Sequence, residues 1–212
     1  LEAEAIKYYA NILTPFSRLV TKKIQEVLGF NLPLDMICTS HGVIWRDNPV
    51  QIVEKYLKWA DDYQEKQITV IYDTMWNATR KMAEAIAEGI KSAAPDYTVK
   101  VLNSSVEDKN DIITEIFKSR GILVGAPTVN NASLHSIGGL LEMIYGLKFK
   151  KKFAAAFGSY GWSGESVGQI SEGLKKAGFE IVNDGLKYMW VPDEEGLKVC
   201  REFGADFAER IK

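Results

Sequence analysis

Asp73-Thr74-Met75-Trp76-Asn77-Ala78-Thr79 directly follows an apolar run from Ile68 to Tyr72, and this junction decides the fold. The run predicts a buried strand that ends at Tyr72. Apolar and small residues then recur at helical spacing on one face of the next segment: Ala83, Ile86, Ala87, Ile90 and Ala94. A strand, a short polar turn and a helix in this order aim backbone N–H groups and the positive end of a helix at one point. Such a corner suits a phosphate group.

The alternation of strand and helix continues from Gln67 to the end of the chain. Further apolar runs predict strands over residues 99–102, 122–124, 153–157 and 181–186. Helical patterns fall between and after them, over residues 78–94, 111–119, 137–145, 165–177 and 193–211. Five strands alternating with five helices predict an α/β fold whose parallel sheet is covered on both faces.

Residues 1–66 follow a different pattern. Helical spacing covers residues 2–12 and 16–28, with Pro15 between them and Gly29 as the stop signal. One short strand is expected over residues 34–38 and a further helix over residues 49–63. A few helices and a single strand cannot close a sheet or bury their own apolar faces. We therefore expect two parts, residues 1–66 and 67–212, of which the first needs a partner absent from this sequence.

Composition narrows the class of protein. The 212 residues are 46% hydrophobic and carry a net charge of −2, which fits a globular chain and gives no reason to expect nucleic acid or an anionic membrane as partner. No apolar run approaches the roughly 20 residues of a membrane span, and no signal peptide is apparent. Cys38 and Cys200 form no metal-binding pair and are expected to be reduced thiols of a cytoplasmic protein. Because Leu1 stands first, the chain is expected to be a piece of something longer.

In a doubly wound sheet, ligands bind outside the carboxyl ends of the strands. The first loop there supplies six candidate cofactor-binding residues: Thr74, Met75, Trp76, Asn77, Ala78 and Thr79. Its hydroxyl and amide groups complete a phosphate cradle, and Arg80 either adds charge or points to solvent. The loop has neither the glycines nor the lysine of a nucleoside triphosphate loop. The alternative is an ordinary polar turn that caps the helix.

The second loop follows the strand over residues 122–124. Its candidate cofactor-binding residues are Pro127, Thr128, Val129, Asn130 and Asn131. Short polar groups beside a stiff proline suit the edge of a planar heterocycle, although Pro-Thr and Asn-Asn pairs are also common in turns.

The third loop follows the strand over residues 153–157. Its candidate cofactor-binding residues are Ser159, Tyr160, Gly161, Trp162, Ser163 and Gly164. Glycines let the backbone approach a ligand, and the two aromatic rings offer faces for stacking. The alternative is that these rings fold back onto the surface of the domain itself.

The three loops together combine a phosphate cradle, polar contacts for a ring edge and aromatic faces. Residues 67–212 thereby resemble the flavodoxin family, which implies a flavodoxin-like, doubly wound, five-stranded sheet with strand order 2-1-3-4-5. The resemblance also implies FMN as cofactor, and FAD is disfavoured because no G-x-G-x-x-G follows a strand. His135, beyond the second loop, is either near the flavin edge or solvated.

Two stretches of the first part sharpen the resemblance. They are Tyr8-Tyr9-Ala10-Asn11-Ile12-Leu13-Thr14-Pro15-Phe16-Ser17 and Leu34-Asp35-Met36-Ile37-Cys38-Thr39-Ser40-His41-Gly42-Val43-Ile44-Trp45-Arg46. Residues 1–66 are similar to the tail of the metallo-β-lactamase-like domain of flavodiiron proteins, also called A-type flavoproteins. That resemblance implies an oxidoreductase that reduces O₂ to water or NO to N₂O, with electrons passing from FMN to a di-iron site.

By the same resemblance His41 is the last di-iron ligand, and a strand-end histidine can present a ring nitrogen to a metal. A hydrogen-bonded structural histidine is the alternative. The other ligands of the family, an H-x-E-x-D-type cluster with a further His and Asp, would lie upstream of Leu1. Residues 1–212 are therefore expected to carry FMN without a competent metal site.

The resemblance also implies partners. A homo-oligomer is expected, either a head-to-tail dimer or a dimer of dimers, and the electron donor is expected to be separate, such as rubredoxin or a reduced deazaflavin. Two other functions remain open: a stand-alone flavodoxin-like electron carrier and an FMN-dependent NAD(P)H:quinone reductase. The latter has no use for residues 1–66. The sequence does not choose between O₂ and NO.

Overall fold

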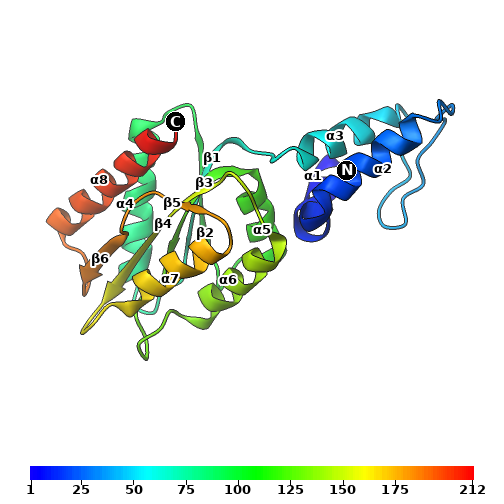
Figure 1. The fold of residues 1–212 in the computed structure, drawn as a ribbon. Helices are drawn as coiled ribbons and strands as arrows, with labels where there is room; N and C mark the ends of the chain where they lie inside the picture. Colours follow the sequence, from blue (N-terminus) through cyan, green and yellow to red (C-terminus); the bar gives the residue numbers. More distant parts are fainter. The chain divides into compact units, whose positions relative to one another are not determined.

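The computed structural model describes residues 1–212, which form two compact units (Figure 1). Unit 1 spans Leu1–Tyr63 and unit 2 spans Gln64–Lys212. Each unit is described by itself.

Unit 2 is built on a parallel sheet in which the strand order is β2-β1-β3-β4-β5 and β6 also pairs with β4. The strands are β1 (Glu65–Tyr72), β2 (Thr98–Asn103), β3 (Ser119–Gly125), β4 (Phe153–Tyr160), β5 (Glu180–Ile181) and β6 (Leu186–Met189). Every pairing is parallel. The α/β fold and the strand order 2-1-3-4-5 predicted from the sequence are confirmed.

The fifth position of the sheet differs from the prediction of one strand over residues 181–186. Two short strands, β5 and β6, both lie beside β4, at Phe153–Ala154 and at Phe157–Tyr160. The chain turns between them: Gly185 has φ +84° and its N–H donates to Asn183 Oδ1 at 3.1 Å. This local turn breaks the ladder, because a residue with positive φ does not continue a strand.

Helices cover both faces of the sheet (Figure 1). One face carries α4 (Ala78–Ala93) and α8 (Glu194–Ile211), and the other carries α5 (Lys109–Lys118), α6 (His135–Leu147) and α7 (Glu165–Lys176). A single buried core joins α4 and α8 to the central strands; it includes Ile68, Val70, Met82, Ile86, Phe157 and Phe207. From Gln67 to Tyr72, every residue of β1 is buried, as expected for a strand covered on both faces.

Unit 1 is mainly helical: α1 (Glu2–Tyr8), the π-helix η1 (Tyr9–Leu13), the 3₁₀-helix η2 (Thr14–Phe16), α2 (Ser17–Leu28) and α3 (Val50–Ala60). The α-helix predicted over residues 2–12 changes its hydrogen-bonding pattern after Tyr8. Pro15 has no N–H to donate, and the Thr14 hydroxyl donates to the carbonyl of Ala10 at 2.9 Å. The strand predicted over residues 34–38 is wrong: only an isolated antiparallel bridge joins Ile37 to Trp45, because no neighbouring strand extends it.

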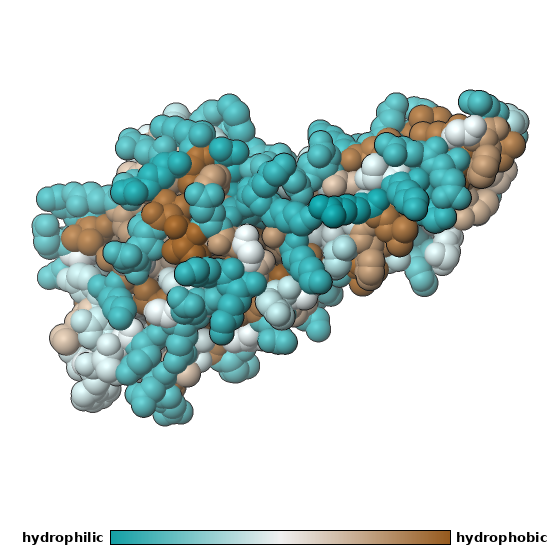
Figure 2. Space-filling view, viewed as in Figure 1, coloured by the Kyte–Doolittle hydropathy of each residue, from teal (hydrophilic) through white to brown (hydrophobic).

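The core of unit 1 is small and aromatic. The Tyr9 ring is fully buried between Tyr56, at 5.2 Å, and Trp59, at 5.6 Å between ring centroids. Many apolar side chains of this unit stay exposed instead: Ile12, Phe16, Leu19, Val27, Leu28, Phe30, Leu32, Met36, Val43 and Ile44. Figure 2 shows brown patches of this kind on unit 1 among polar residues. In the whole chain, no helix combines the length and the apolar character that a membrane span requires.

Candidate functional site

The loops that follow β1, β3 and β4 lie together at the carboxyl edge of the sheet. Backbone hydrogen bonds join them in pairs: the N–H of Asp73 donates to the carbonyl of Gly125, and the N–H of Thr128 donates to the carbonyl of Ser159, both at 3.0 Å. The structure therefore brings together the three loops that the sequence singled out.

The first loop leaves the amino end of α4 open. Asn77 occupies the N-cap position with φ +63°, and its side chain makes no capping hydrogen bond. The first N–H groups of an α-helix have no partner within the helix, and at α4 no capping side chain supplies one. Beside them, the buried hydroxyl oxygen of Thr74 has no hydrogen-bond partner. A buried hydroxyl without a partner is costly, and an acceptor from outside the chain would satisfy that of Thr74.

Thr79 and Arg80 point elsewhere. The Thr79 side chain is fully buried, and its hydroxyl lies 3.0 Å from that of Ser159, which ties the first loop to β4. Arg80 forms an ion pair with Glu84 one helical turn away, at 2.8 Å, so its charge is already paired. Met75 and Trp76, in contrast, leave 53% and 82% of their surface exposed at the tip of the loop.

The second loop is held to α7. The Thr128 hydroxyl donates to Ser166 Oγ at 2.9 Å and accepts from the Ser166 N–H at 3.2 Å. Asn130 and Asn131 both have positive φ, and a bridge between Val129 and Ala132 closes the turn around them. Pro127 is half-buried at the exit of β3, and His135 lies exposed at the first position of α6.

The third loop presents an aromatic ring to solvent. The Trp162 side chain is 87% exposed, whereas Tyr160 is half-buried and its ring lies under Gly164. Ser163 donates to Glu165 at 2.8 Å, and Gly164 has φ +79° at the start of α7. Trp162 therefore has not folded back onto the body of the domain.

Two features of this edge were not predicted from the sequence. The Asp73 side chain is buried and accepts hydrogen bonds from residues of three segments: Thr74, Ser105 and Ser136. Trp190, directly after β6, packs edge-on against Trp162. Trp190 had no signal in the sequence, because β6 was not predicted and the strand expected over residues 181–186 ends before it.

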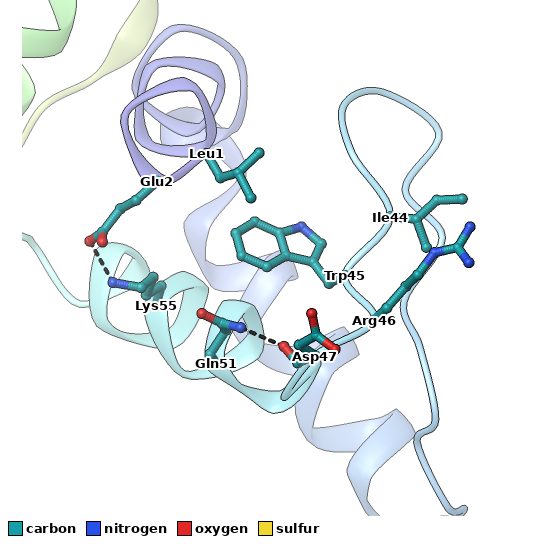
Figure 3. A pocket seen from close by; sticks show the side chains of 8 residues that line it. All are labelled: Leu1, Glu2, Ile44, Trp45, Arg46, Asp47, Gln51 and Lys55. Atoms are coloured by element: carbon teal, nitrogen blue, oxygen red, sulfur yellow. Dashed lines mark hydrogen bonds and ion pairs between the residues drawn. The ribbon is translucent and has the colours of Figure 1, made fainter.

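His41 lies in unit 1, exposed, with the Tyr8 ring at 5.9 Å. Residues 1–212 hold no group of three or more His, Cys, Asp or Glu side chains that could bind a metal. Unit 1 also contains a pocket of about 370 Å³ (Figure 3). Glu2, which pairs with Lys55, lines this pocket together with Leu1, Ile44, Trp45, Arg46, Asp47 and Gln51. His41 is not among them.

A parallel sheet in this order, with an uncapped helix N-terminus and exposed aromatic rings in the loops at its carboxyl edge, defines a flavodoxin-like protein. Residues 70–204 match the family model described as Flavodoxin, and the chain belongs to this family.

The relatives include longer proteins. The chain is 58% identical over 204 residues to the anaerobic nitric oxide reductase flavorubredoxin of Escherichia coli strain K12, covering 96% of this chain and 42% of that protein. It superimposes on the rubredoxin oxygen:oxidoreductase of Desulfovibrio gigas with a TM-score of 0.91 and 32% identity, over 97% of this chain and 51% of the other. The chain superimposes on the flavodiiron protein of Giardia intestinalis with a TM-score of 0.89 and 26% identity, over 97% of this chain and 51% of the other. The predicted resemblance to flavodiiron proteins is confirmed, and the chain spans about half of these relatives or less.

The flavodoxin family and the flavodiiron relatives imply FMN as the cofactor, and the residues present fit it. The unpartnered Thr74 hydroxyl beside the open end of α4 matches a phosphate, whose oxygens accept hydrogen bonds from hydroxyl and N–H donors. The exposed rings of Trp76 and Trp162 match a flat, partly apolar heterocycle.

Proposed function

We propose that unit 2 binds FMN at the carboxyl edge of its sheet and that the protein is the electron-transfer part of a flavodiiron oxidoreductase. The observation that carries the FMN site is the buried, unpartnered hydroxyl of Thr74 at the open amino end of α4. When bound, FMN supplies one- and two-electron redox chemistry.

We assign the phosphate to the first loop. The Thr74 hydroxyl, the Asn77 amide and the N–H groups at the start of α4, from Ala78 and Thr79, donate to it. The second loop, from Pro127 to Asn131, lies along the ring edge. The third loop, from Ser159 to Gly164, supplies Tyr160 and Trp162 as flanking rings. Met75 and Trp76 close the site from the opposite loop, and their high exposure supports this role because a ligand would cover them.

Residues 1–66 are proposed to be the last part of a metallo-β-lactamase-like di-iron domain. Its largely exposed apolar side chains support this, since they require a covering layer. His41 would then be one iron ligand, and the remaining iron ligands would come from outside residues 1–212. By the names of its relatives, the complete protein is proposed to reduce NO or O₂ and to receive electrons from a rubredoxin-type donor.

The finer assignments are also proposals. A head-to-tail homo-oligomer would bring the flavin of one subunit to the metals of its partner. A cytoplasmic location is proposed because Cys38 and Cys200 are both free thiols.

The full-length protein tests this function. We expect it to contain FMN and two irons per chain and to consume NO or O₂ with a reduced rubredoxin. His41→Ala should lose iron and turnover while FMN content stays unchanged. Lys58→Ala, an exposed position of α3, serves as the matched control in the same unit. A full-length protein that holds FMN but binds no iron would refute the assignment.

A stand-alone electron carrier is the second candidate. The match of residues 70–204 to the Flavodoxin family model supports it, because that match lies within unit 2 alone. A carrier would reduce a partner protein without turning over NO or O₂ even when full length, and this outcome separates the two functions.

A further inference from the structure

We propose that Asp73 is a positioning residue for the phosphate cradle: it holds the Thr74 backbone so that the Thr74 hydroxyl stays free for the phosphate of FMN. This inference rests on the proposed FMN site and adds a residue that donates nothing to the ligand itself.

The Asp73 carboxylate is buried, with only 4% of the residue exposed, and its hydrogen-bond donors come from this chain. Oδ1 accepts from the Thr74 N–H at 2.7 Å and from the Ser105 hydroxyl at 2.9 Å. Oδ2 accepts a hydrogen bond from the Ser136 hydroxyl. A carboxylate that is buried away from water needs such donors. A buried carboxylate oxygen without a hydrogen bond costs more free energy than the bond itself contributes.

These donors come from separate parts of the fold. Ser105 follows β2, Ser136 lies in the first turn of α6, and Thr74 follows β1. Ser104 strengthens the link, since its hydroxyl lies 2.9 Å from that of Ser136 and its N–H donates to the carbonyl of Tyr72 at 2.8 Å. Asp73 therefore fastens the first loop to two neighbouring segments below the cradle.

The effect on Thr74 is specific. The Asp73 carboxylate accepts a hydrogen bond from the backbone N–H of Thr74, and the N–H of Asp73 donates to the carbonyl of Gly125. These bonds fix the backbone on both sides of the Asp73 side chain. The Thr74 hydroxyl is buried and unpartnered within this anchored turn. A preorganised donor binds an anion more tightly than one that must first be ordered. Loss of the Asp73 carboxylate should therefore weaken binding of the phosphate and not of the ring.

The test is a double-mutant cycle on the 212-residue chain, with FMN and riboflavin as the two probes. Riboflavin has the same ring without the phosphate. Dissociation constants come from quenching of flavin fluorescence for wild type, Asp73→Ala, Thr74→Val and the double variant. Asp206→Ala, on the distant half of α8, is the control for loss of an aspartate.

We expect Asp73→Ala to weaken FMN binding about tenfold or more, because the Thr74 hydroxyl then loses its hydrogen bond to the charged phosphate. Riboflavin binding should change less than about twofold. In the Thr74→Val background, the same change should alter FMN binding by less than about twofold, because the two residues act as one unit. The control should bind both probes like wild type.

Equal weakening of FMN and riboflavin by Asp73→Ala would overturn the inference, and so would full additivity with Thr74→Val. If Asp73→Ala does not fold, Ser136→Ala removes one donor with less disruption and decides the question by the same ratio of FMN to riboflavin affinity. A wild-type chain that binds neither probe would instead refute the proposed FMN site, a result distinct from an Asp73 variant that binds FMN normally.

Discussion

The indole rings of Trp162 and Trp190 meet edge to face, with centroids 5.4 Å apart and planes at 70°. Trp190 adopts φ +61°, and its N–H donates to the carbonyl of Tyr160 at 2.7 Å. Gly161 makes room for it, since a Cβ at that position would lie 2.8 Å from the Trp190 ring. Trp190 therefore braces the most exposed ring of the proposed flavin site from the neighbouring strand end.

Replacement of Trp190 should weaken FMN binding without abolishing it. An edge-to-face aromatic pair contributes about 0.5–1.5 kcal/mol, so Trp190→Leu is expected to weaken FMN binding about two- to tenfold. Trp190→Phe keeps an aromatic edge and should lose less. The measurement is the dissociation constant of FMN together with the visible circular dichroism of the bound flavin. Unchanged affinity and spectrum in Trp190→Leu would contradict this role.

The crossing of α4 and α8 depends on two glycines. A Cβ on Gly204 would lie 2.2 Å from the carbonyl oxygen of Ile86, and one on Gly89 would lie 1.9 Å from that of Arg201. Gly204→Ala must push the helices apart and should lower the free energy of unfolding by about 1–3 kcal/mol. Gly146→Ala, on α6 with no neighbour within 4 Å, is the matched control and should raise it by about 0.5–1 kcal/mol. Urea unfolding measures both, and equal effects would be inconsistent with the close crossing.

Lys152 is buried directly before β4, and its side chain contacts the end of α5. Its ammonium donates to the carbonyls of Phe117 and Ser119 at 2.7 and 2.6 Å. Lys152→Met keeps much of the volume but leaves two buried acceptors short of a donor, so we expect a loss of about 2 kcal/mol in unfolding free energy. Lys150→Met, at an exposed position two residues earlier, should change little. Equal stability of the two variants would show that the buried ammonium contributes nothing net.

The two thiols should differ sharply in reactivity. Cys38 is exposed, whereas Cys200 is fully buried against the α4–α8 core. Burial raises the pKa of the Cys200 thiol to about 11, and the nearby Arg201 opposes this only in part. Because the thiolate is the reactive form, titration with a disulfide reagent at pH 8 should modify one thiol in the native chain and two after unfolding. Fast modification of a Cys38→Ser variant would contradict the burial of Cys200.

The same pKa gives a dependence of stability on pH. The folded state keeps the Cys200 proton up to about pH 11, while an unfolded cysteine loses it near pH 8.5. Between these values the folded state binds more protons, so the free energy of unfolding should fall as pH rises. Compared with wild type, Cys200→Ala should show a shallower fall over this window in urea unfolding. Parallel curves would argue against the raised pKa.

Most of the fold could be predicted from the sequence because β1, β3 and β4 are short, apolar runs separated by helices with clear periodicity. The break between β5 and β6 was not predicted. It depends on a single turn at Gly185 between two segments that both pair with β4. A strand was predicted over residues 34–38, where the structure has only an isolated bridge at Ile37. A short apolar run forms a strand only where a neighbouring strand pairs with it.

For the candidate site, the sequence located the loops but not the contacts among them. The partners of Asp73 lie up to 63 residues away, and serines have no pattern that announces such a role. Thr79 and Thr74 look alike in sequence, yet one hydroxyl is paired with Ser159 and the other has no partner. Only the packing of β4 against the first loop separates them.

The most direct test of the FMN site is a titration of the flavin-free 212-residue chain with FMN, followed by flavin fluorescence. We expect a 1:1 complex with quenched fluorescence, and a Thr74→Val variant that binds FMN about tenfold or more weakly while its riboflavin affinity is unchanged. A chain that takes up no FMN, or a Thr74→Val variant that binds FMN as tightly as wild type, would contradict a phosphate cradle at this corner of the sheet.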